Sequence, residues 1–371
     1  MKIKKFFSCF SYLPATVLLI GIFVPFVTNF FIGNTALLDN RPLNQKPTRF
    51  SASYFKEWED YYNDTFAGRR KLIRKYTKLR KKLGFSGSAF FMGEDGWSFY
   101  DSQVNENSNS IIDYYGLMPY SNDELADMRK TGLRNVSFYK ERKIPYAIFI
   151  APNKENIYSE YMPARYKKAR TSDESRADKA AKEFSPNIPI VNLKPFLLKA
   201  KATTPVRLYY KTDTHWNEVG GYLAFQEIMK FAEPDFKTPD ISTLEIIQDG
   251  TKKGDLDDAE PDIEYRVSYL KEQNPVLIQT GWEDEKHYIE AYENKTAPLQ
   301  KTIIVFRDSF GAALVPYFSR TYAKSYFIHR LAGHKKPLFE IIEQIKPDVV
   351  ADVVVERLFP NVFSTYNLKG E

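Results

Sequence analysis

The sequence predicts an α/β domain in which a parallel sheet is covered by helices on both faces, a three-layer α/β/α arrangement. Four short apolar runs are interpreted as buried strands, at residues 146–151, 188–193, 302–306 and 348–355. Helical patterns alternate with them, at about 122–142, 217–232, 311–320 and 337–346. Continuous apolar strands that alternate with helices are typical of a parallel sheet buried on both sides.

The start of the chain predicts a membrane anchor. Residues 6–33 contain no charged side chain, and this stretch is long enough to cross a bilayer core of ~30 Å. The lysines ahead of it, at positions 2, 4 and 5, favour an N-terminus that stays in the cytoplasm. No clear cleavage motif of small residues follows, so we expect residues 1–33 to form an uncleaved single-pass anchor. The rest of the chain would then face the periplasm or the cell exterior.

Beyond the anchor, residues 34–53 are interpreted as a linker and residues 54–371 as one domain. The domain is expected to open with a helix over 54–83 that ends at Gly84. One face of this helix is basic, which indicates either a solvated surface or contact with lipid head groups or an anionic polymer. Residues 234–300 are rich in Asp, Glu and Lys, and are predicted to form a polar insertion.

Charge and cysteine content exclude several classes of function. The net charge is +6, and the three lysines before the anchor supply half of it, so the remaining chain is close to neutral. A near-neutral domain of this size argues against a dedicated nucleic-acid-binding protein. Cys9 is the only cysteine, so neither an intramolecular disulfide nor a thiolate metal site can form.

The stretch YYKTDTHWNEVGGY, residues 209–222, contains a candidate catalytic base. Asp213 and His215 are two positions apart, which in an extended segment places both side chains on the same side. An aspartate beside a histidine holds one imidazole tautomer and stabilises its positive charge. The other histidines, at positions 287, 329 and 334, lie in the polar insertion or flank a basic loop, and are poorer candidates.

A metal site is not expected. One aspartate and one histidine fall short of a usual zinc ligand set, and no second histidine or cysteine pair completes it. The acidic run GDLDDAEPD, residues 254–262, lacks the glycine position of an EF-hand loop and is interpreted as a solvated loop. We therefore predict neither a metal nor another cofactor.

Ser309 is the candidate nucleophile. The apolar run 302–306 continues directly into RDSFGAAL, where a helix is predicted to begin just after Ser309. A serine at a tight turn from a buried strand into a helix is exposed at the end of the strand, near backbone N–H groups that can stabilise an oxyanion. The alternative is that Ser309 only caps the helix. Together with Asp213 and His215 it makes a complete set of nucleophile, base and orienting acid.

Several motifs, in one order along the chain, resemble those of the AlgJ/AlgX-type proteins, the SGNH-hydrolase-like acetyltransferases of bacterial exopolysaccharide modification. They are DNRPLNQKP (39–47), YYNDTFAGRRKL (61–72), GEDGWSFY (93–100), APNKENIYSEYMP (151–163), YYKTDTHWNEVGGY (209–222), RDSFGAAL (307–314) and VVVERLFP (353–360). The resemblance implies a permuted SGNH-hydrolase-like fold, in which the Asp-His element precedes the serine.

The resemblance also implies roles for individual residues. Asp213, His215 and Ser309 would form the catalytic triad. Lys154 and Tyr158 fall in a motif near the active cleft of the family, and with Trp216 they are candidate substrate contacts; Asn153, beside Lys154, either points into the site or belongs to a loop. Arg307 stands where glycine often precedes Asp-Ser in the family, and there it would either crowd the turn or bind an acyl oxygen or an anionic substrate.

The expected function is that of an extracytoplasmic O-acetyltransferase. The resemblance implies that an acetyl group carried on Ser309 passes to a hydroxyl of a bacterial exopolysaccharide or cell-surface glycan. It also implies a multi-pass membrane acyltransferase as the partner that supplies the acetyl group. Two alternatives stay open: a carbohydrate acetylesterase that uses the same triad, and a non-catalytic polysaccharide assembly protein that keeps the fold.

Overall fold

The computed structural model of the chain describes residues 45–50, 53–65, 75, 90–101, 110–256, 261–282, 285–329 and 338–364. Its contacts divide the chain into two compact units, 1–85 and 86–371. Within the first unit, helix α3 (Tyr54–Thr65) is the described part of the helix predicted over 54–83, together with residue 75. The predicted anchor, residues 1–33, lies outside the described residues. No helix among those described is long and apolar enough to cross a membrane.

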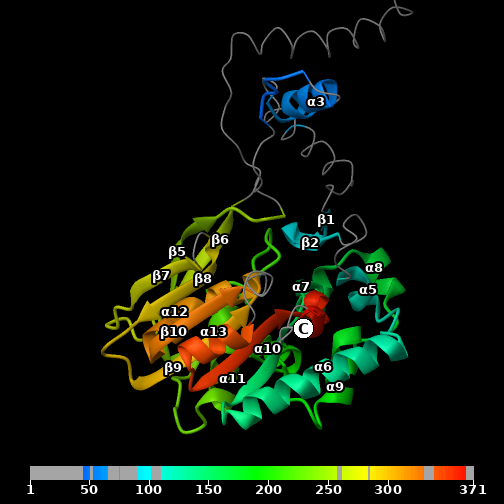
Figure 1. Cartoon of the computed structure of the whole chain (residues 1–371). Coiled ribbons are helices and arrows are strands. Elements are labelled where there is room, and N and C mark those ends of the chain that lie inside the picture. The colour runs from blue at the N-terminus through cyan, green and yellow to red at the C-terminus, as the bar shows by residue number, and fades with distance from the viewer. Residues whose placement is uncertain are drawn as a thin grey trace, which may run out of the picture. The chain divides into compact units, whose positions relative to one another are not determined.

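The second unit is built on a seven-stranded sheet with the order β4-β3-β11-β9-β10-β8-β7 (Figure 1). The first five strands are parallel, whereas β8 and β7 are antiparallel to their neighbours. The strands are β3 (Tyr146–Ala151), β4 (Ile190–Asn192), β7 (Val276–Trp282), β8 (Glu285–Glu293), β9 (Leu299–Arg307), β10 (Tyr322–His329) and β11 (Val349–Val355). The four predicted strands are therefore confirmed as β3, β4, β9 and β11, and the α/β class with a largely parallel sheet is confirmed with them.

The region predicted as a polar insertion contributes to the sheet. Strands β7 and β8 extend the edge beyond β10, and β5 (Ile246–Lys252) pairs with β6 (Asp262–Val267) in a separate hairpin. These strands were not predicted because a strand with only one buried face alternates apolar and polar residues and lacks a continuous apolar run. Even the apolar residues Val276 and Ile278 at the outer strand are exposed.

Helices cover both faces of the sheet because side chains of successive strand residues point to opposite sides. On one side Phe149, Val305 and Val353 pack in an apolar cluster with the first helix layer. On the other, Ile148, Ile304 and Val354 pack with the second. The first layer contains α10 (Lys194–Thr203), α11 (Glu218–Ala232) and α12 (Val315–Thr321); the second contains α6 (Asn122–Glu141), α9 (Arg176–Phe184), α13 (Leu338–Ile345) and α14 (Asn361–Ser364).

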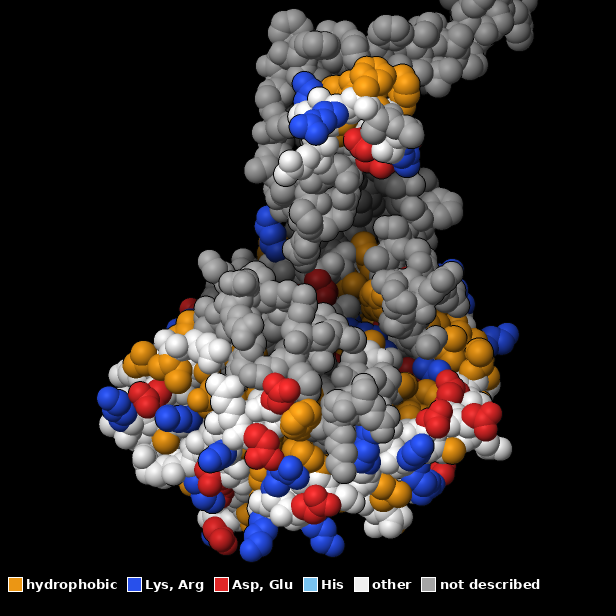
Figure 2. All heavy atoms as spheres, viewed as in Figure 1, with side chains coloured by type: hydrophobic (Ala, Val, Ile, Leu, Met, Phe, Trp, Pro, Cys, Tyr) orange, Lys and Arg blue, Asp and Glu red, His pale blue; other side chains and the backbone are white. Residues whose placement is uncertain are grey.

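Shorter elements complete the unit around the first layer. They are the hairpin β1 (Phe90–Met92) and β2 (Ser98–Tyr100), with the helices α5 (Ser110–Tyr115), α7 (Lys154–Ile157) and α8 (Ala164–Ala169). On the face shown in Figure 2, basic and acidic side chains are interspersed rather than separated by sign, as expected for a nearly neutral domain.

Helix α11 begins at a capping residue that also marks the end of the loop with Asp213 and His215. The Asn217 side chain accepts hydrogen bonds from the N–H groups of Val219 and Gly220, at 3.0 and 3.1 Å. Asparagine is among the preferred N-cap residues because its side chain satisfies backbone donors that have no partner within the helix. The sequence THWN therefore ends the loop and starts the helix at a defined position.

Substitution of Ile304, in the centre of β9, tests how much burial in the parallel sheet contributes to the free energy of unfolding. Ile304 is fully buried, whereas Ile278 on the edge strand β7 is 48% exposed. We expect Ile304→Ala to lower the free energy of unfolding by about 2–5 kcal/mol, because it leaves a cavity between β9 and the second helix layer. The matched control Ile278→Ala should change it by less than about 1 kcal/mol. Chemical denaturation of the purified variants measures both, and equal losses would contradict this assignment of core and edge.

Candidate active site

Ser309 lies at the carboxyl end of β9, where the chain turns into the short helix η4 (Ser309–Leu314). The N-cap of this helix is Asp308, whose Oδ1 accepts from Phe310 N at 2.9 Å. Its other oxygen, Oδ2, accepts from Val355 N at 2.7 Å and so joins the turn to β11. The capping role considered for Ser309 thus belongs to its neighbour, and Ser309 itself is exposed.

The backbone donors near this turn are partly engaged. Phe310 N donates to the Asp308 side chain, and Gly311 N donates to the Asp308 carbonyl at 3.2 Å. The sequence predicted backbone N–H groups here that stabilise an oxyanion. Two of them are instead used to close the turn that presents Ser309.

The structure brings the three predicted catalytic side chains together. His215 Nε2 lies 2.8 Å from Ser309 Oγ, and His215 Nδ1 lies 2.6 Å from Asp213 Oδ1. Asp213 Oδ1 also accepts from the backbone N of His215 at 2.9 Å, so it orients the residue through both groups. Asp213 is buried, His215 is half-buried and Ser309 is exposed, which is the order of increasing solvent access expected along such a relay.

The charge of Asp213 is set by two opposing effects. Burial of the carboxyl favours its neutral form. The hydrogen bond to His215, the charge of that imidazole and the ammonium of Lys252, which lies 3.6 Å from Asp213 Oδ2, outweigh burial and hold the pKa well below its ordinary value. Asp213 is therefore ionised at neutral pH and can stabilise a positive imidazole.

The geometry of the Asp213–His215 pair differs from the extended segment expected. The chain folds back on itself, with Tyr209 bridged to Trp216 and Asn217 N donating to Leu208 O at 2.9 Å. Within this loop the Asp213 side chain closes a turn onto the N–H two residues later, as aspartate commonly does. This local turn, rather than strand alternation, places both side chains on one side.

Trp216, a predicted substrate contact, is buried and instead links the loop to the turn that carries the nucleophile. Only 1% of it is exposed, and its Nε1 donates to Phe310 O at 2.8 Å. The Phe310 ring in turn packs against His215, with ring centroids 4.8 Å apart. Trp216 therefore fixes the position of the base relative to Ser309.

Lys154, also predicted to contact substrate, lies inside the protein. Its ammonium donates to the carbonyls of Tyr210, Lys211 and Asp213, at 3.3, 3.1 and 2.7 Å. Burial lowers its pKa to about 8, although the carboxylates of Glu155, Asp255, Asp213 and Asp262 oppose the shift. A side chain that is 2% exposed and saturated by backbone acceptors supports the loop and does not face a polymer.

Tyr158 and Asn153, from the same motif, are buried as well. The Tyr158 hydroxyl accepts from Leu208 N at 2.8 Å, and burial raises its pKa to about 12. Asn153 donates its backbone N–H to Glu356 Oε2 at 2.8 Å and accepts from Arg357 at 3.2 Å. Both residues connect segments that are distant in sequence, so the structure places Tyr158, a predicted substrate contact, and Asn153 in the internal support of the site.

Arg307 neither crowds the turn nor extends into solvent. Its side chain packs against Gly311, where an added Cβ would lie 2.4 Å from the Cβ of Arg307. The guanidinium is directed toward Glu290 on β8, at 3.6 Å, and donates to Asp308 O at 3.3 Å. Glycine at position 311 makes room for the arginine, which explains how this departure from the family pattern is accommodated.

The sequence analysis missed Asp255. It lies in the acidic run 254–262, which was predicted to be a solvated loop. Its carboxylate accepts from Thr214 N and Thr214 Oγ1, at 2.7 and 2.6 Å, and its Oδ2 lies 3.5 Å from His215 Nδ1. In the same run Asp262 is buried and pairs with Arg207. No local pattern could reveal these contacts, because their partners are about 40–55 residues away in sequence.

Asp213, His215 and Asp255 are the one group of potential metal ligands found in the part of the chain that the structure describes. Their ligand atoms lie within 4.8 Å of one another. These atoms are already engaged: Asp213 Oδ1 with His215 Nδ1, and both oxygens of Asp255 with Thr214. Two carboxylates and one imidazole joined in this way fit a hydrogen-bonded relay better than a zinc site.

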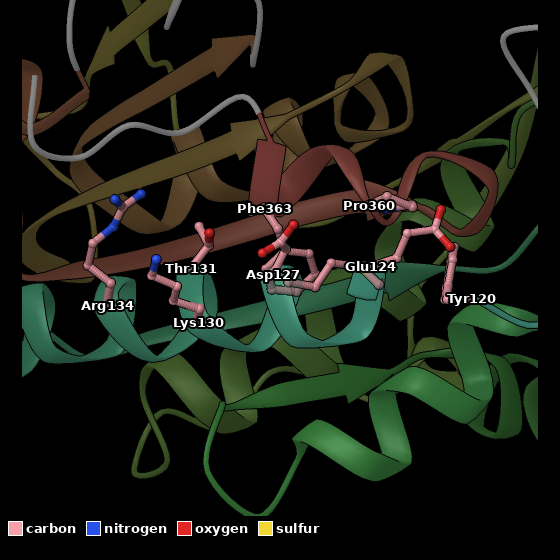
Figure 3. Close-up of a pocket in the computed structure, with 9 residues that line it drawn as sticks. Tyr120, Glu124, Asp127, Lys130, Thr131, Arg134, Pro360 and Phe363 are labelled. Atoms are coloured by element: carbon pink, nitrogen blue, oxygen red, sulfur yellow. The ribbon is translucent and has the colours of Figure 1, made fainter. Parts of the chain in front are cut away.

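A separate cavity of about 470 Å³ runs along α6 and is bordered on its other side by Pro360 and Phe363 (Figure 3). Glu124, Asp127, Lys130 and Arg134 line it from the helix. None of its lining residues belongs to the Asp213–His215–Ser309 cluster. This cavity therefore does not contribute to the candidate active site.

Solved structures that are similar to this chain with a TM-score of 0.50 or more show a shared fold. Bacillus cereus PatB1 with a sulfonyl adduct is similar with a TM-score of 0.57 and 16% identity, over 75% of this chain and 99% of that chain. A DHHW family protein from Eubacterium siraeum is similar with a TM-score of 0.50 and 15% identity, over 77% and 98%. The O-acetyltransferase domain of Pseudomonas putida AlgJ is similar with a TM-score of 0.44 and 16% identity, over 73% and 92%. No curated protein matches the sequence.

The family match comes from the sequence itself. Residues 90–279 match the family model described as SGNH hydrolase-like domain, acetyltransferase AlgX. This segment is about half of the chain and includes Asp213 and His215, while Ser309 follows it. The chain belongs to the family of SGNH hydrolase-like acetyltransferase AlgX domains.

Proposed function

We propose that this protein is an extracytoplasmic O-acetyltransferase that acetylates hydroxyls of a bacterial exopolysaccharide or cell-surface glycan through an acyl-enzyme on Ser309. The observation that carries the proposal is the continuous hydrogen-bonded set Asp213–His215–Ser309 in a member of an acetyltransferase family. The exposed hydroxyl of Ser309 gives a large acceptor access to the acyl group.

The first half of the reaction loads Ser309. His215 Nε2 accepts the hydroxyl proton as Ser309 Oγ attacks the carbonyl carbon of the acetyl donor. Asp213 stabilises the imidazolium that forms and keeps its Nδ1 protonated. The imidazolium then returns the proton to the leaving group, and the acetyl group remains on Ser309 as an ester.

The second half repeats these steps with a different nucleophile. A sugar hydroxyl gives its proton to His215 and attacks the acetyl carbonyl, which releases Ser309 and yields an acetylated glycan. If water takes the place of the sugar, the product is acetate and the enzyme is an esterase. The exposure of Ser309 favours esterase activity as the second candidate, because water also reaches the ester.

The proposed location and partner rest on the anchor predicted over residues 1–33. A domain held outside the cytoplasm has no direct access to cytoplasmic acetyl-CoA. We therefore propose a multi-pass membrane acyltransferase as the source of the acetyl group and a polysaccharide as the acceptor. The chemistry at Ser309 needs no cofactor, because the three side chains supply the nucleophile, the base and the stabilising charge.

Covalent labelling tests the nucleophile. The related PatB1 structure carries a sulfonyl adduct, and we expect a sulfonyl fluoride to modify this protein once, at Ser309. Intact-protein mass spectrometry should show one adduct in the wild type and none in Ser309→Ala. Ser185→Ala, which removes another exposed serine hydroxyl at a helix end, serves as the matched control and should label like the wild type. Equal labelling of Ser309→Ala and the wild type would rule out Ser309 as the nucleophile.

Product analysis distinguishes the candidate functions. The wild type and Ser309→Ala are incubated with a small acetyl ester, with and without oligosaccharides, and the masses of protein and sugars are recorded. Acetylated sugar that depends on Ser309 establishes transfer. Acetate release without sugar acetylation supports the esterase, and a protein that yields no acetyl adduct, no acetate and no acetylated sugar supports the non-catalytic assembly role.

Asp213→Asn tests the relay and its charge. We expect acylation to slow by about 10,000-fold, because the variant loses both the stabilising charge and the correct tautomer. The folded pKa of Asp213 lies below the ordinary 3.8, so its ionisation stabilises the fold above that value and this contribution is lost as pH falls through it. The stability of wild type relative to Asp213→Asn should thus decline as pH falls from the ordinary value of 3.8 toward the lower folded pKa. A difference that keeps growing in this acidic range would contradict this assignment.

A further inference from the structure

Part of the β5–β6 hairpin lies directly against the loop that carries Asp213 and His215. Leu256 N donates to Thr212 O at 3.1 Å, and Asp255 N donates to Asp213 Oδ2 at 3.3 Å. Gly254 makes this approach possible, since an added Cβ there would lie only 1.9 Å from Thr212 O. Residues 254–256 of the predicted insertion are therefore in contact with the loop that carries the candidate base.

Asp255 makes the most specific of these contacts. Its two carboxylate oxygens accept from the N–H and the hydroxyl of Thr214, the residue between Asp213 and His215. The Thr214 hydroxyl lies 3.2 Å from His215 Nδ1, and Asp255 Oδ2 lies 3.5 Å from the same nitrogen. Asp255 thus holds the backbone of the loop and places a second carboxylate beside the imidazole.

The charges around His215 show what this second carboxylate adds. Asp213 and Asp255 face its Nδ1. Three described cations contact neighbours of His215. Lys252 pairs with Asp213 Oδ2, Lys154 donates to the Asp213 carbonyl, and Arg357 lies over the Phe310 ring that packs against the imidazole. Because about a third of the Asp255 side chain is exposed, its effect on the imidazole is screened but not abolished.

We propose that Asp255 is a positioning residue for His215, through which the β5–β6 hairpin orients the catalytic base and stabilises its protonated form. The contribution to catalysis rests on the proposed function, whereas the effect on the imidazole does not. Asp255 does not replace Asp213, which remains the direct hydrogen-bond partner of Nδ1. Asp255 holds the turn that contains Asp213 through its hydrogen bonds to Thr214, and it adds negative charge on the Nδ1 side of the imidazole.

The test follows the His215 ring directly. The full-length protein is labelled with ¹⁵N-histidine, and the ring signals of its four histidines are followed through a pH titration. The signal of His215 is assigned by its loss in His215→Gln. We expect Asp255→Asn to move the titration midpoint of His215 to lower pH by roughly 0.5–1 unit, because removal of an adjacent negative charge disfavours the imidazolium.

Sulfonylation of Ser309 by a sulfonyl fluoride provides the second readout. At a pH where the imidazole is unprotonated in both proteins, the weaker base of Asp255→Asn should slow this reaction by at most roughly 3- to 10-fold, and Asp255→Glu should recover most of both effects. Asp249→Asn is the matched control: Asp249 pairs with Arg266 on the same hairpin and should leave both readouts unchanged.

Gly254→Val gives an independent route to the same result. It changes no charge but forces the hairpin away from Thr212, so it should shift the His215 titration in the same direction as Asp255→Asn. If Asp255→Asn does not fold, the His215 titration in Gly254→Val alone tests the proposal. A His215 titration that is unchanged in both variants would overturn the proposal, whatever happens to the rate of sulfonylation. A shifted titration in a protein that is never acylated would instead uphold the positioning role and reject the proposed function.

Discussion

One buried ammonium organises the loop on which the candidate site depends. Lys154 follows β3 and donates to the carbonyls of Tyr210, Lys211 and Asp213. A cation excluded from water costs several kcal/mol unless acceptors surround it, so the loop has to close around Lys154 for the domain to fold well. The position of the Asp213 and His215 side chains follows from this closure. The same contact thereby serves stability and the geometry of the relay.

Buried carboxylates hold the opposite side of the site, where the parallel strands end. Asp308 joins the end of β9 to Val355 at the end of β11, and Glu356 accepts from Asn153 and Asn156 beyond β3. Burial raises the pKa of Glu356, as expected for an acid held in the interior. Through these bonds Ser309 is presented by three strands rather than by a free loop. Such rigidity favours catalysis, since little reorganisation is needed once a substrate binds.

The base and the nucleophile are supported by separate parts of the chain that meet only in the folded protein. The hydrogen bond from Trp216 to the Phe310 carbonyl joins the loop with the candidate base to the turn with the candidate nucleophile. Asp255, between the two strands of the β5–β6 hairpin, accepts from Thr214 and supports the loop with the base separately. The side chains first considered as substrate contacts, Lys154, Tyr158 and Trp216, are all part of this internal support. Ser309 remains exposed among buried neighbours, which suits a reaction that passes an acyl group to a bulky acceptor.

The sequence by itself determined the sheet class and the candidate relay. Four continuous apolar runs located β3, β4, β9 and β11, because a strand buried on both faces is apolar along its length. The motifs around Asp213, His215 and Ser309 predicted the candidate reacting groups, because each lies in a short pattern with its own local chemistry. Only the tertiary structure decided that Lys154, Tyr158, Trp216 and Arg307 point inward, that β7 and β8 join the sheet, and that Asp255 reaches His215. Each of these contacts joins residues that are tens of positions apart in the sequence. A local sequence pattern does not predict which distant backbone group a buried side chain will contact.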